Sequence, residues 1–321
     1  MPSFHAYVDL GSNTFQMLIA PFPSFEFREV FSNDGQIYSK EIFVLLRHAI
    51  NAQGHISKAG LSRAQKALMH IRSILAHKNV QAIYVTATEV FRRYPSAQKV
   101  LQLAHTILGV RPRLIDGITE AQLGALAAQI EFDDVTTAWS MDIGGGSTEI
   151  TFQRKGRMLF EISLPLGSTH LTRKFPSVTT PPISSDLQMR ILDYIRRQWE
   201  KIPIYPSLSL IGIGGFFETL RRLTCQRQML PDSFVHWQHA FLHHPKSHWL
   251  SYPIPNFRIP LLPICALLVR SFMEYQQTFR LYLATFSLKE GLWIAHCQNS
   301  PLFHRIFPES ASTDSTTNEG P

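Results

Sequence analysis

A motif that occurs twice constrains this chain more than any other feature. Each copy is a short apolar stretch that ends in an aspartate, passes through a glycine-rich tip and returns as an alternating strand. Asp9 precedes the tip of the first copy, and Asp142 precedes the tip of the second. One such tip alone is typical of an ordinary β-hairpin. Two tips with an aspartate at the same offset indicate a duplicated unit whose halves face each other across a cleft.

The residue types in both tips suit the binding of phosphate. Glycine allows positive φ and lets backbone N–H groups converge on an anion, and hydroxyl side chains add further donors. An aspartate beside such a tip offers a hard carboxylate to a divalent cation or to a water. The predicted phosphate-binding residues are Gly11, Ser12, Asn13, Thr14, Gly144, Gly145, Gly146, Ser147 and Thr148.

Length and composition favour a packed protein of about two domains. The chain has 321 residues, of which 45% are hydrophobic and 11% aromatic, as expected of a globular core. A formal charge of +7 suits an anionic partner, and charge alone also admits nucleic acid. The three cysteines are widely separated without a CxxC spacing, which argues against a disulfide framework or a zinc site.

No targeting or membrane segment is apparent in the sequence. The first residues lack the basic and apolar regions of a secretory signal. The most apolar run, residues 259–269, contains two prolines and is about half the ~20 residues that a membrane span needs. We expect a soluble, cytoplasmic protein without a membrane partner.

The order of predicted elements alternates between helix and strand in both halves. In the first half, helical spacing at residues 61–75 precedes a strand at 82–88, a helix at 97–108, a short strand at 114–115 and a helix that opens with Thr119 as its N-cap. The second half continues with a strand at 158–164, a helix at 187–199 and a strand at 208–211. We predict an α/β domain at residues 1–128, a second at 129–307 and a disordered tail at 308–321.

Five blocks in one order carry a family resemblance. They lie at residues 9–14, 87–92, 116–121, 142–149 and 164–167. Together they resemble the exopolyphosphatase and guanosine pentaphosphate phosphohydrolase (Ppx/GppA) family in a short two-domain form. The match covers roughly residues 5–220 and resumes at residues 288–292. The resemblance implies a bacterial protein with a duplicated, actin-like ATPase (ribonuclease H-like) fold, an active site in the interdomain cleft, and a C-terminal helix at 287–298 that packs back on the first domain.

The resemblance also implies a reaction and the residues that perform it. Water would remove a terminal phosphate from polyphosphate or from guanosine pentaphosphate (pppGpp), with Mg²⁺ or Mn²⁺ as cofactor. Asp142 and Glu149, together with Asp9, would hold the metal, Glu120 would be the base, and Arg92 would contact phosphate. A loop with Gly212, Gly214 and Gly215 would bind the far part of the substrate. These implications disfavour nucleic acid as a partner and are compatible with a homodimer.

Four departures from the family pattern affect the predicted substrate. Thr119 stands where a second glutamate is usual, and Glu89 replaces a small hydroxyl residue. Residues 44–48 read Val-Leu-Leu-Arg-His in place of Val-Arg-Leu-Gly-Glu, and Phe216 replaces a threonine after the third loop. The leading hypothesis is an exopolyphosphatase. The alternatives are a pppGpp phosphohydrolase, a non-hydrolysing sensor of polyphosphate or an alarmone, and, with a poorer fit, an ATP-dependent kinase.

The histidine-rich segment at residues 236–249 leads to a second prediction. Five histidines lie there among two tryptophans and a phenylalanine, and Asp232 is the acidic residue near them. The pattern leaves open a metal site, but it favours an aromatic, partly buried loop.

Overall fold

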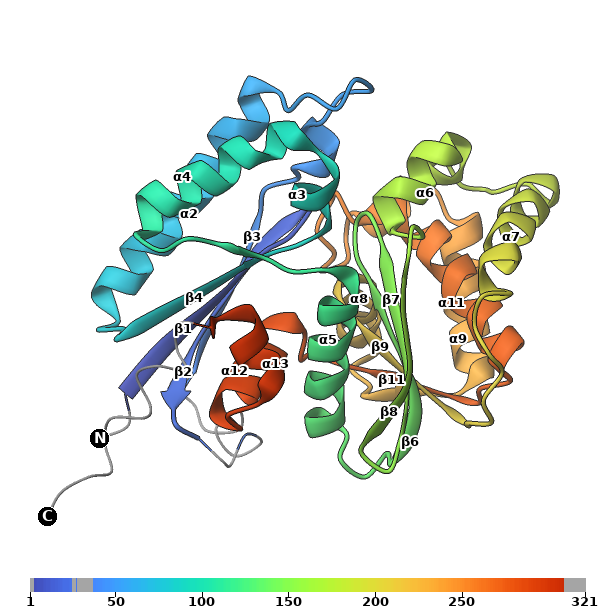
Figure 1. Cartoon of the computed structure of the whole chain (residues 1–321). Coiled ribbons are helices and arrows are strands. Elements are labelled where there is room, and N and C mark those ends of the chain that lie inside the picture. Colours follow the sequence, from blue (N-terminus) through green and yellow to red (C-terminus); the bar gives the residue numbers. More distant parts are fainter. Residues whose placement is uncertain (1–2, 25–26, 28–36, 309–321) are drawn as a thin grey trace, which may run out of the picture. The chain divides into compact units, whose positions relative to one another are not determined.

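The computed structural model describes residues 3–24, 27 and 37–308 and divides into two compact units (Figure 1). Unit 1 comprises Met1–Ile130 and Leu288–Pro321, and unit 2 comprises Glu131–Ser287. The chain therefore leaves unit 1 once and returns to it near its C-terminal end. The predicted disordered tail lies, from residue 309 onward, outside the described residues.

Unit 1 is built on a five-stranded sheet of order β3-β2-β1-β4-β5. Strands β1, β2 and β3 are antiparallel, whereas β1, β4 and β5 run parallel. The strands are β1 (Ser3–Leu10), β2 (Thr14–Phe22), β3 (Tyr38–Phe43), β4 (Ala82–Ala87) and β5 (Arg113–Leu114).

Helices cover both faces of this sheet. They are α2 (Lys58–His77), α3 (Glu89–Arg93), α4 (Gln98–Leu108), α5 (Gly117–Glu131), α12 (Leu288–Cys297) and α13 (Pro301–Ile306), with short 3₁₀ turns η1 (Arg47–Ala49) and η2 (Pro95–Ala97). Alternate residues of β1 enter two clusters: Ala6 and Val8 pack with the buried side of α2 and α4, while Tyr7 packs with α12 and α13. Burial on both faces explains why β1 reads as a nearly continuous apolar run.

The C-terminal helices are part of unit 1 because specific contacts tie them to it. Trp293 of α12 donates its indole N–H to the carbonyl of Pro21 at 2.9 Å. Gly291 allows a close helix approach, since a Cβ there would overlap the carbonyl oxygen of Leu123 in α5. The motif around Gly291 is therefore explained by packing within unit 1.

Unit 2 is built on a six-stranded sheet of order β10-β11-β9-β6-β7-β8. Its strands are β6 (Thr137–Ile143), β7 (Thr148–Arg154), β8 (Arg157–Leu164), β9 (Ser209–Ile213), β10 (Gln228–Met229) and β11 (Arg280–Leu283). Its helices are α6 (Ser168–Lys174), α7 (Ser185–Trp199), α8 (Gly215–Thr224), α9 (Pro231–His243), α10 (Lys246–Trp249) and α11 (Leu262–Gln276), with η3 (Pro176–Thr179) and η4 (Ile259–Leu261). Trp139 and Trp199 pack edge-on against Phe272 of α11 in one core.

The two sheets repeat the same topology. In unit 1 the sheet reads β3-β2-β1-β4-β5, and in unit 2 the strands β8-β7-β6-β9-β11 follow the same order with β10 added at the edge. Each repeat starts with an antiparallel hairpin, β1–β2 or β6–β7, whose first strand also pairs in parallel with the strand that follows a helical crossover. The duplication predicted from the two motifs is thus present in the fold.

Two local predictions are wrong. Thr119 is not the N-cap of α5, because the helix already begins at Gly117 and Asp116 accepts the Thr119 N–H on its side chain at 2.6 Å. The histidine-rich segment is not a loop, since residues 231–243 form α9, where His239 and His243 stack one turn apart. Asp116 caps α5 in place of Thr119, because aspartate is as good an N-cap as threonine and Asp116 lies one turn earlier.

Candidate active site

The first glycine-rich tip is a four-residue turn between β1 and β2. The N–H of Gly11 donates to the carbonyl of Thr14 at 2.9 Å. The carbonyl of Asn13 accepts from the N–H groups of Val44 and Leu45, and the carbonyl of Ser12 accepts from the N–H of Arg47. In a trans peptide the N–H points opposite to the carbonyl. The amides of Asn13 and Thr14 therefore point away from this supporting segment, as an anion site requires.

The second tip repeats this turn and is supported by the start of α6. The N–H of Gly144 donates to the carbonyl of Ser147 at 3.0 Å. The carbonyls of Gly144, Gly145 and Gly146 accept from the N–H groups of Ser168, His170 and Gly167, respectively. By the same peptide geometry, the three amides of residues 145–147 point away from α6. Successive N–H groups on one side of a turn form a concavity that suits an anion.

Gly167 is the residue that permits this support. A Cβ at Gly167 would overlap the backbone of Gly145 and Gly146. The Leu-Pro-Leu-Gly block at residues 164–167 therefore has a physical role: its glycine lets α6 approach the second tip. In the sequence this block contributes only to the resemblance, and no role was predicted for Gly167 or Ser168.

The carboxylates of unit 2 form a pair on one face of the sheet. Asp142 of β6 lies directly opposite Glu149 of β7, and directly opposed residues of antiparallel strands project to the same side. Glu149 is buried and accepts a hydrogen bond from the hydroxyl of Ser163 on β8 at 2.7 Å. Burial raises the pKa of Asp142 to about 6. Ser163 was missed in the sequence, although its place opposite Glu149 follows from the alternation of β7 and β8.

This pair fits a divalent cation. Like charges at directly opposed positions repel each other, and a desolvated carboxylate such as Asp142 favours its neutral form. A hard cation between the two carboxylates would relieve both costs, and carboxylate oxygens are ligands that Mg²⁺ prefers. Across the described residues, no three His, Cys, Asp or Glu side chains gather as a complete metal site. Asp9, the third predicted ligand, belongs to unit 1, where the hydroxyl of Thr86 donates to it at 3.4 Å.

The two predicted catalytic side chains of unit 1 contact each other. Arg92 of α3 forms an ion pair with Glu120 and also donates to the carbonyl of Ile115. Glu120 lies in the first turn of α5, which Asp116 caps. The guanidinium is thus held at the carboxyl ends of β4 and β5, beside the predicted base.

Glu89, which departs from the family pattern, contacts the first tip. Glu89 is buried, and its carboxylate accepts a hydrogen bond from the hydroxyl of Ser12 at 3.2 Å. Arg93 lies 3.6 Å from the same carboxylate. The negative charge at residue 89 is therefore partly balanced, and the Ser12 hydroxyl is oriented by a protein carboxylate.

The third glycine loop connects β9 to α8 in unit 2. Gly214 has a φ of +94°, and a Cβ there would lie 2.8 Å from Oδ1 of Asp142. A Cβ at Gly215 would lie 2.9 Å from the guanidinium of Arg258, and one at Gly212 would overlap the ring of Phe217. The loop therefore needs its glycines because of close contacts inside unit 2.

The same loop fixes the place of Phe216. Its ring is 6% exposed and packs at 5.4 Å from the ring of Phe217 and 6.0 Å from that of Phe241. Beside it, burial favours a neutral Glu218, but Arg258 and Arg222 outweigh this effect and lower the pKa of that carboxyl. Phe216 is thus a core residue of unit 2.

Comparisons with known proteins bear on the family and the fold of this chain. A model of the Ppx/GppA phosphatase family matches residues 34–220, more than half of the chain. Among solved structures, an exopolyphosphatase from Cytophaga hutchinsonii matches with a TM-score of 0.82 at 21% identity, over 94% of this chain and 99% of that one. The PPX-GPPA enzyme of Aquifex aeolicus matches with a TM-score of 0.75 at 19% identity, over 92% of this chain and all of that one (100%).

These matches confirm the predicted α/β fold, and the two sheets show its duplication. At such identities the structural likeness concerns the fold, whereas the family model bears on the sequence itself. The family assignment also confirms the prediction of a phosphoanhydride hydrolase. The chain belongs to the Ppx/GppA phosphatase family.

Proposed function

We propose that this protein releases the terminal phosphate of inorganic polyphosphate by attack of water. The observation that carries the proposal is the backbone of the second tip, where three successive amides point away from α6 and beside which lies the Asp142–Glu149 pair. Hydrolysis of a phosphoanhydride requires neutralisation of charge and an oriented water, with little covalent work by the protein. Amides of both tips would bind the phosphate oxygens of the substrate.

Unit 1 would supply the groups that act on the water. Glu120 would accept the proton of the attacking water, and Arg92 would hold Glu120 in place and contact a phosphate oxygen. The ion pair between these side chains supports this division of roles. An arginine suits the task because its planar fork matches two phosphate oxygens at once.

Asp142 and Glu149, with Asp9, would hold Mg²⁺ or Mn²⁺. The bound cation would neutralise charge on the phosphates. Ser163 would keep Glu149 in its orientation through their hydrogen bond, and Gly214 would leave room for Asp142.

The alternative substrate is pppGpp, and the alternative class is a sensor that binds without hydrolysis. The core position of Phe216 removes one means of stacking on a guanine in unit 2, which favours the phosphate chain. The test is phosphate release by the purified protein from long-chain polyphosphate and from pppGpp, each with magnesium and with EDTA. We expect magnesium-dependent release from polyphosphate. Release from pppGpp alone would show that the nucleotide is the substrate. Tight binding of either compound without release of phosphate would identify a sensor.

In the part of the chain that the structure describes, no helix combines the length and apolarity that crossing a lipid bilayer demands.

A further inference from the structure

The exposed side of α9 carries two histidines one turn apart. Phe234 and Phe241 pack the opposite side of this helix into the core of unit 2, so that His239 and His243 face solvent. Residues four apart in a helix are neighbours on its surface. The two imidazole rings accordingly stack, with their centroids 4.0 Å apart and their planes 21° from parallel.

A hydrogen bond fixes which nitrogen of His243 can bind a metal. Its Nδ1 lies 2.8 Å from the carbonyl oxygen of His239. A carbonyl can only accept, so Nδ1 carries the proton and Nε2 keeps its lone pair. Metal-binding histidines have the same arrangement, in which the N–H on the far side of the ring donates to a carbonyl or a carboxylate. The backbone of α9 therefore sets the tautomer of His243 that a metal requires.

The spacing of the two rings suits a single metal ion. Zinc binds imidazole nitrogens at about 2.0–2.1 Å, so two nitrogens on one ion lie at most about 4.2 Å apart. The ring centroids of His239 and His243 are already within that distance. In the part of the chain that the structure describes, no hydrogen bond or ion pair engages the ring of His239. This ring can therefore turn towards an ion without the loss of a polar contact.

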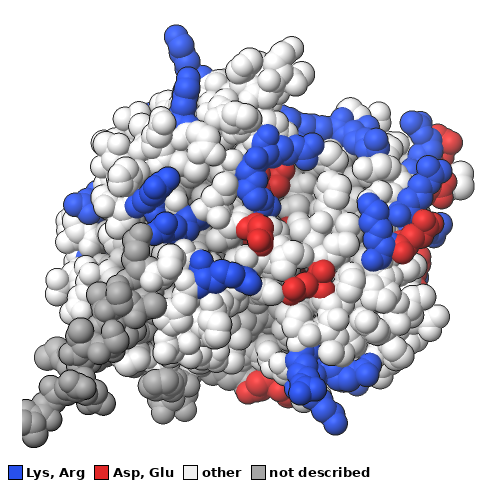
Figure 2. All heavy atoms as spheres, in the orientation of Figure 1, with Lys and Arg blue, Asp and Glu red and all other residues white. Residues whose placement is uncertain are grey.

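The charge of the surface does not by itself attract cations. Lys and Arg outnumber Asp and Glu by 31 to 24, and they also predominate on the face of the molecule that Figure 2 shows. A basic surface repels metal ions in general. Imidazole binds zinc, nickel and copper ions as a neutral ligand, through its lone pair. Coordination by paired imidazoles therefore supplies the attraction that the surrounding charge does not.

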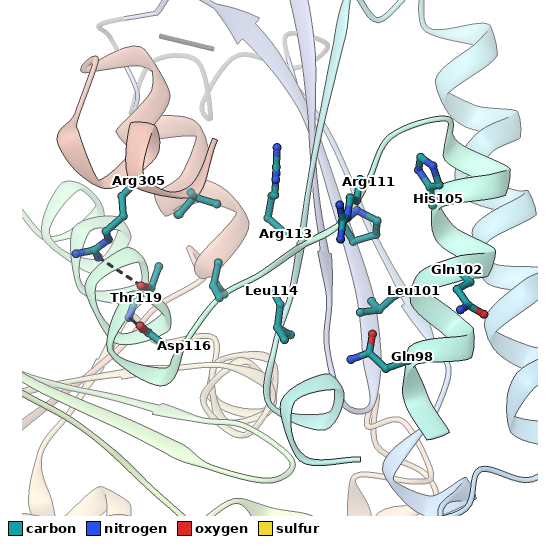
Figure 3. Close-up of a pocket in the computed structure, with 13 residues that line it drawn as sticks. Gln98, Leu101, Gln102, His105, Arg111, Arg113, Leu114, Asp116, Thr119 and Arg305 are labelled. Carbon is teal, nitrogen blue, oxygen red and sulfur yellow. Dashed lines mark hydrogen bonds between the residues drawn. The ribbon is translucent and has the colours of Figure 1, made fainter. Parts of the chain in front are cut away.

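His105 in unit 1 has a setting that disfavours a metal. This exposed histidine lines a cavity of about 870 Å³ together with Arg111 (Figure 3). A guanidinium near an imidazole repels a cation. His105 is also the single histidine among the described residues that line this cavity. The pair on α9 thus differs from an ordinary exposed histidine in having a second ring beside it.

We propose that His239 and His243 form a site for a divalent transition metal ion of the zinc, nickel and copper class. Nε2 of His243 is one ligand and a ring nitrogen of His239 is the other. Among the described residues no cluster of three His, Cys, Asp or Glu side chains exists, so water completes the coordination of the ion. The site is separate from the Asp142–Glu149 pair, whose oxygen ligands suit magnesium, and it does not depend on the proposed hydrolysis.

Titration calorimetry of the whole chain with zinc chloride tests this site. Magnesium chloride is present in excess to occupy the carboxylate pair, because magnesium prefers oxygen ligands to imidazole. The wild type is compared with His239→Gln, with His243→Gln and with the double variant. All of these changes are at exposed positions, so the Tm in EDTA should equal that of the wild type. This measurement separates the loss of a ligand from the loss of the fold.

Two double variants serve as controls. His70→Gln/His77→Gln removes two exposed histidines from α2, where Nδ1 of His77 likewise donates to a backbone carbonyl one turn earlier. This control matches the pair in burial and tautomer but not in spacing. His244→Gln/His248→Gln removes a neighbouring stacked pair, whose rings are 4.3 Å apart and in which His248 also packs against Trp249.

We expect the wild type to bind one zinc ion that the double variant His239→Gln/His243→Gln binds at least about tenfold more weakly, since the loss of even an outer partner of a metal ligand costs that much. Each single variant should lose nearly as much as the double variant, because two residues that act as a pair have non-additive effects. Both controls should bind this ion as the wild type does. Absence of zinc binding by the wild type, unchanged affinity in the double variant, or an equal loss in either control would overturn the proposal.

Discussion

Glu149 lies directly opposite Asp142 across the β6–β7 hairpin, so that two carboxylates project from the same face of one sheet. Ser163 on the next strand binds Glu149, while Asp142 is desolvated and has its pKa raised to about 6. Such an arrangement costs stability unless a cation or a proton compensates it. The energetic cost of this pair can be measured by removing one of its carboxylates.

Replacing Asp142 by Asn should stabilise the metal-free protein. A carboxylate whose pKa is raised in the folded state loses stability as the pH rises from its ordinary value of 3.8 to about 6, and the full cost persists above that pH. A shift of roughly two units corresponds to at most about 3 kcal/mol. Thermal unfolding at pH 7.5 in EDTA should show a higher Tm for Asp142→Asn than for the wild type.

Magnesium should then reverse the order of the two proteins. It should raise the Tm of the wild type, because the proposed ligands come together only in the folded protein, and it should leave the Tm of Asp142→Asn nearly unchanged. Asp186→Asn is the control, since Asp186 is exposed at the start of α7. A wild-type Tm that does not respond to magnesium would contradict the assignment of Asp142 as a ligand.

Removing the charge of Glu89 should tighten the binding of phosphate chains. Its carboxylate accepts from Ser12 in the first tip, so that a negative charge stands next to a site for anions. Glu89→Gln keeps an oxygen that can accept from Ser12 and should lower KM for polyphosphate several-fold. Glu200→Gln, on the exposed end of α7, controls for net charge. An increase in KM would mean that the orientation of Ser12 matters more than the charge.

Unit 1 should lose stability in mild acid because of its buried histidines. His296 is 7% exposed and bonded to the hydroxyl of Tyr7 at 2.9 Å. Burial, followed by the nearby His5 and His304, lowers the pKa of His296 to about 3. The unfolded chain therefore binds a proton that the folded chain does not, and stability falls as the pH drops from about 6.5 towards 3, by about 1.4 kcal/mol per pH unit.

Denaturant unfolding at pH 7.5 and pH 5.5 checks this expectation. His296→Gln should be less stable than the wild type at pH 7.5 but should lose less stability between the two pH values. His70→Gln, on the exposed side of α2, should lose as much as the wild type. Equal losses in His296→Gln and the wild type would show that another group causes the acid sensitivity.

Local patterns in the sequence predicted the hairpins, the alternation of helices and strands, and the duplication. Each depends on residues that are neighbours along the chain, such as the aspartate and glycine that flank each turn. The prediction of an N-cap at Thr119 failed because two good capping residues lie three positions apart, and Asp116 reaches the helix first. Local patterns thus identified α5 as a helix but not its first residue.

The arrangement of the site depends on contacts between distant parts of the sequence. The pairing of Asp142 with Glu149 is set by the register of the hairpin, and a shift of one residue would place them on opposite faces. The support of the second tip comes from residues 167–170. Gly167 is needed there only because α6 approaches the backbone of the tip so closely. The core position of Phe216 follows only from the packing of α8, which places its ring against that of Phe241. Tertiary packing, which sequence patterns do not encode locally, decided these three points.

In the proposed mechanism, Glu120 activates water for magnesium-dependent hydrolysis of polyphosphate. The most direct measurement is single-turnover release of phosphate from long-chain polyphosphate by the wild type and Glu120→Gln, with binding measured in parallel. We expect magnesium-dependent release by the wild type and a rate at least about a hundredfold lower for Glu120→Gln, with binding retained. Release by Glu120→Gln at the wild-type rate would contradict the role of Glu120, and no release by the wild type in magnesium would contradict the proposed activity.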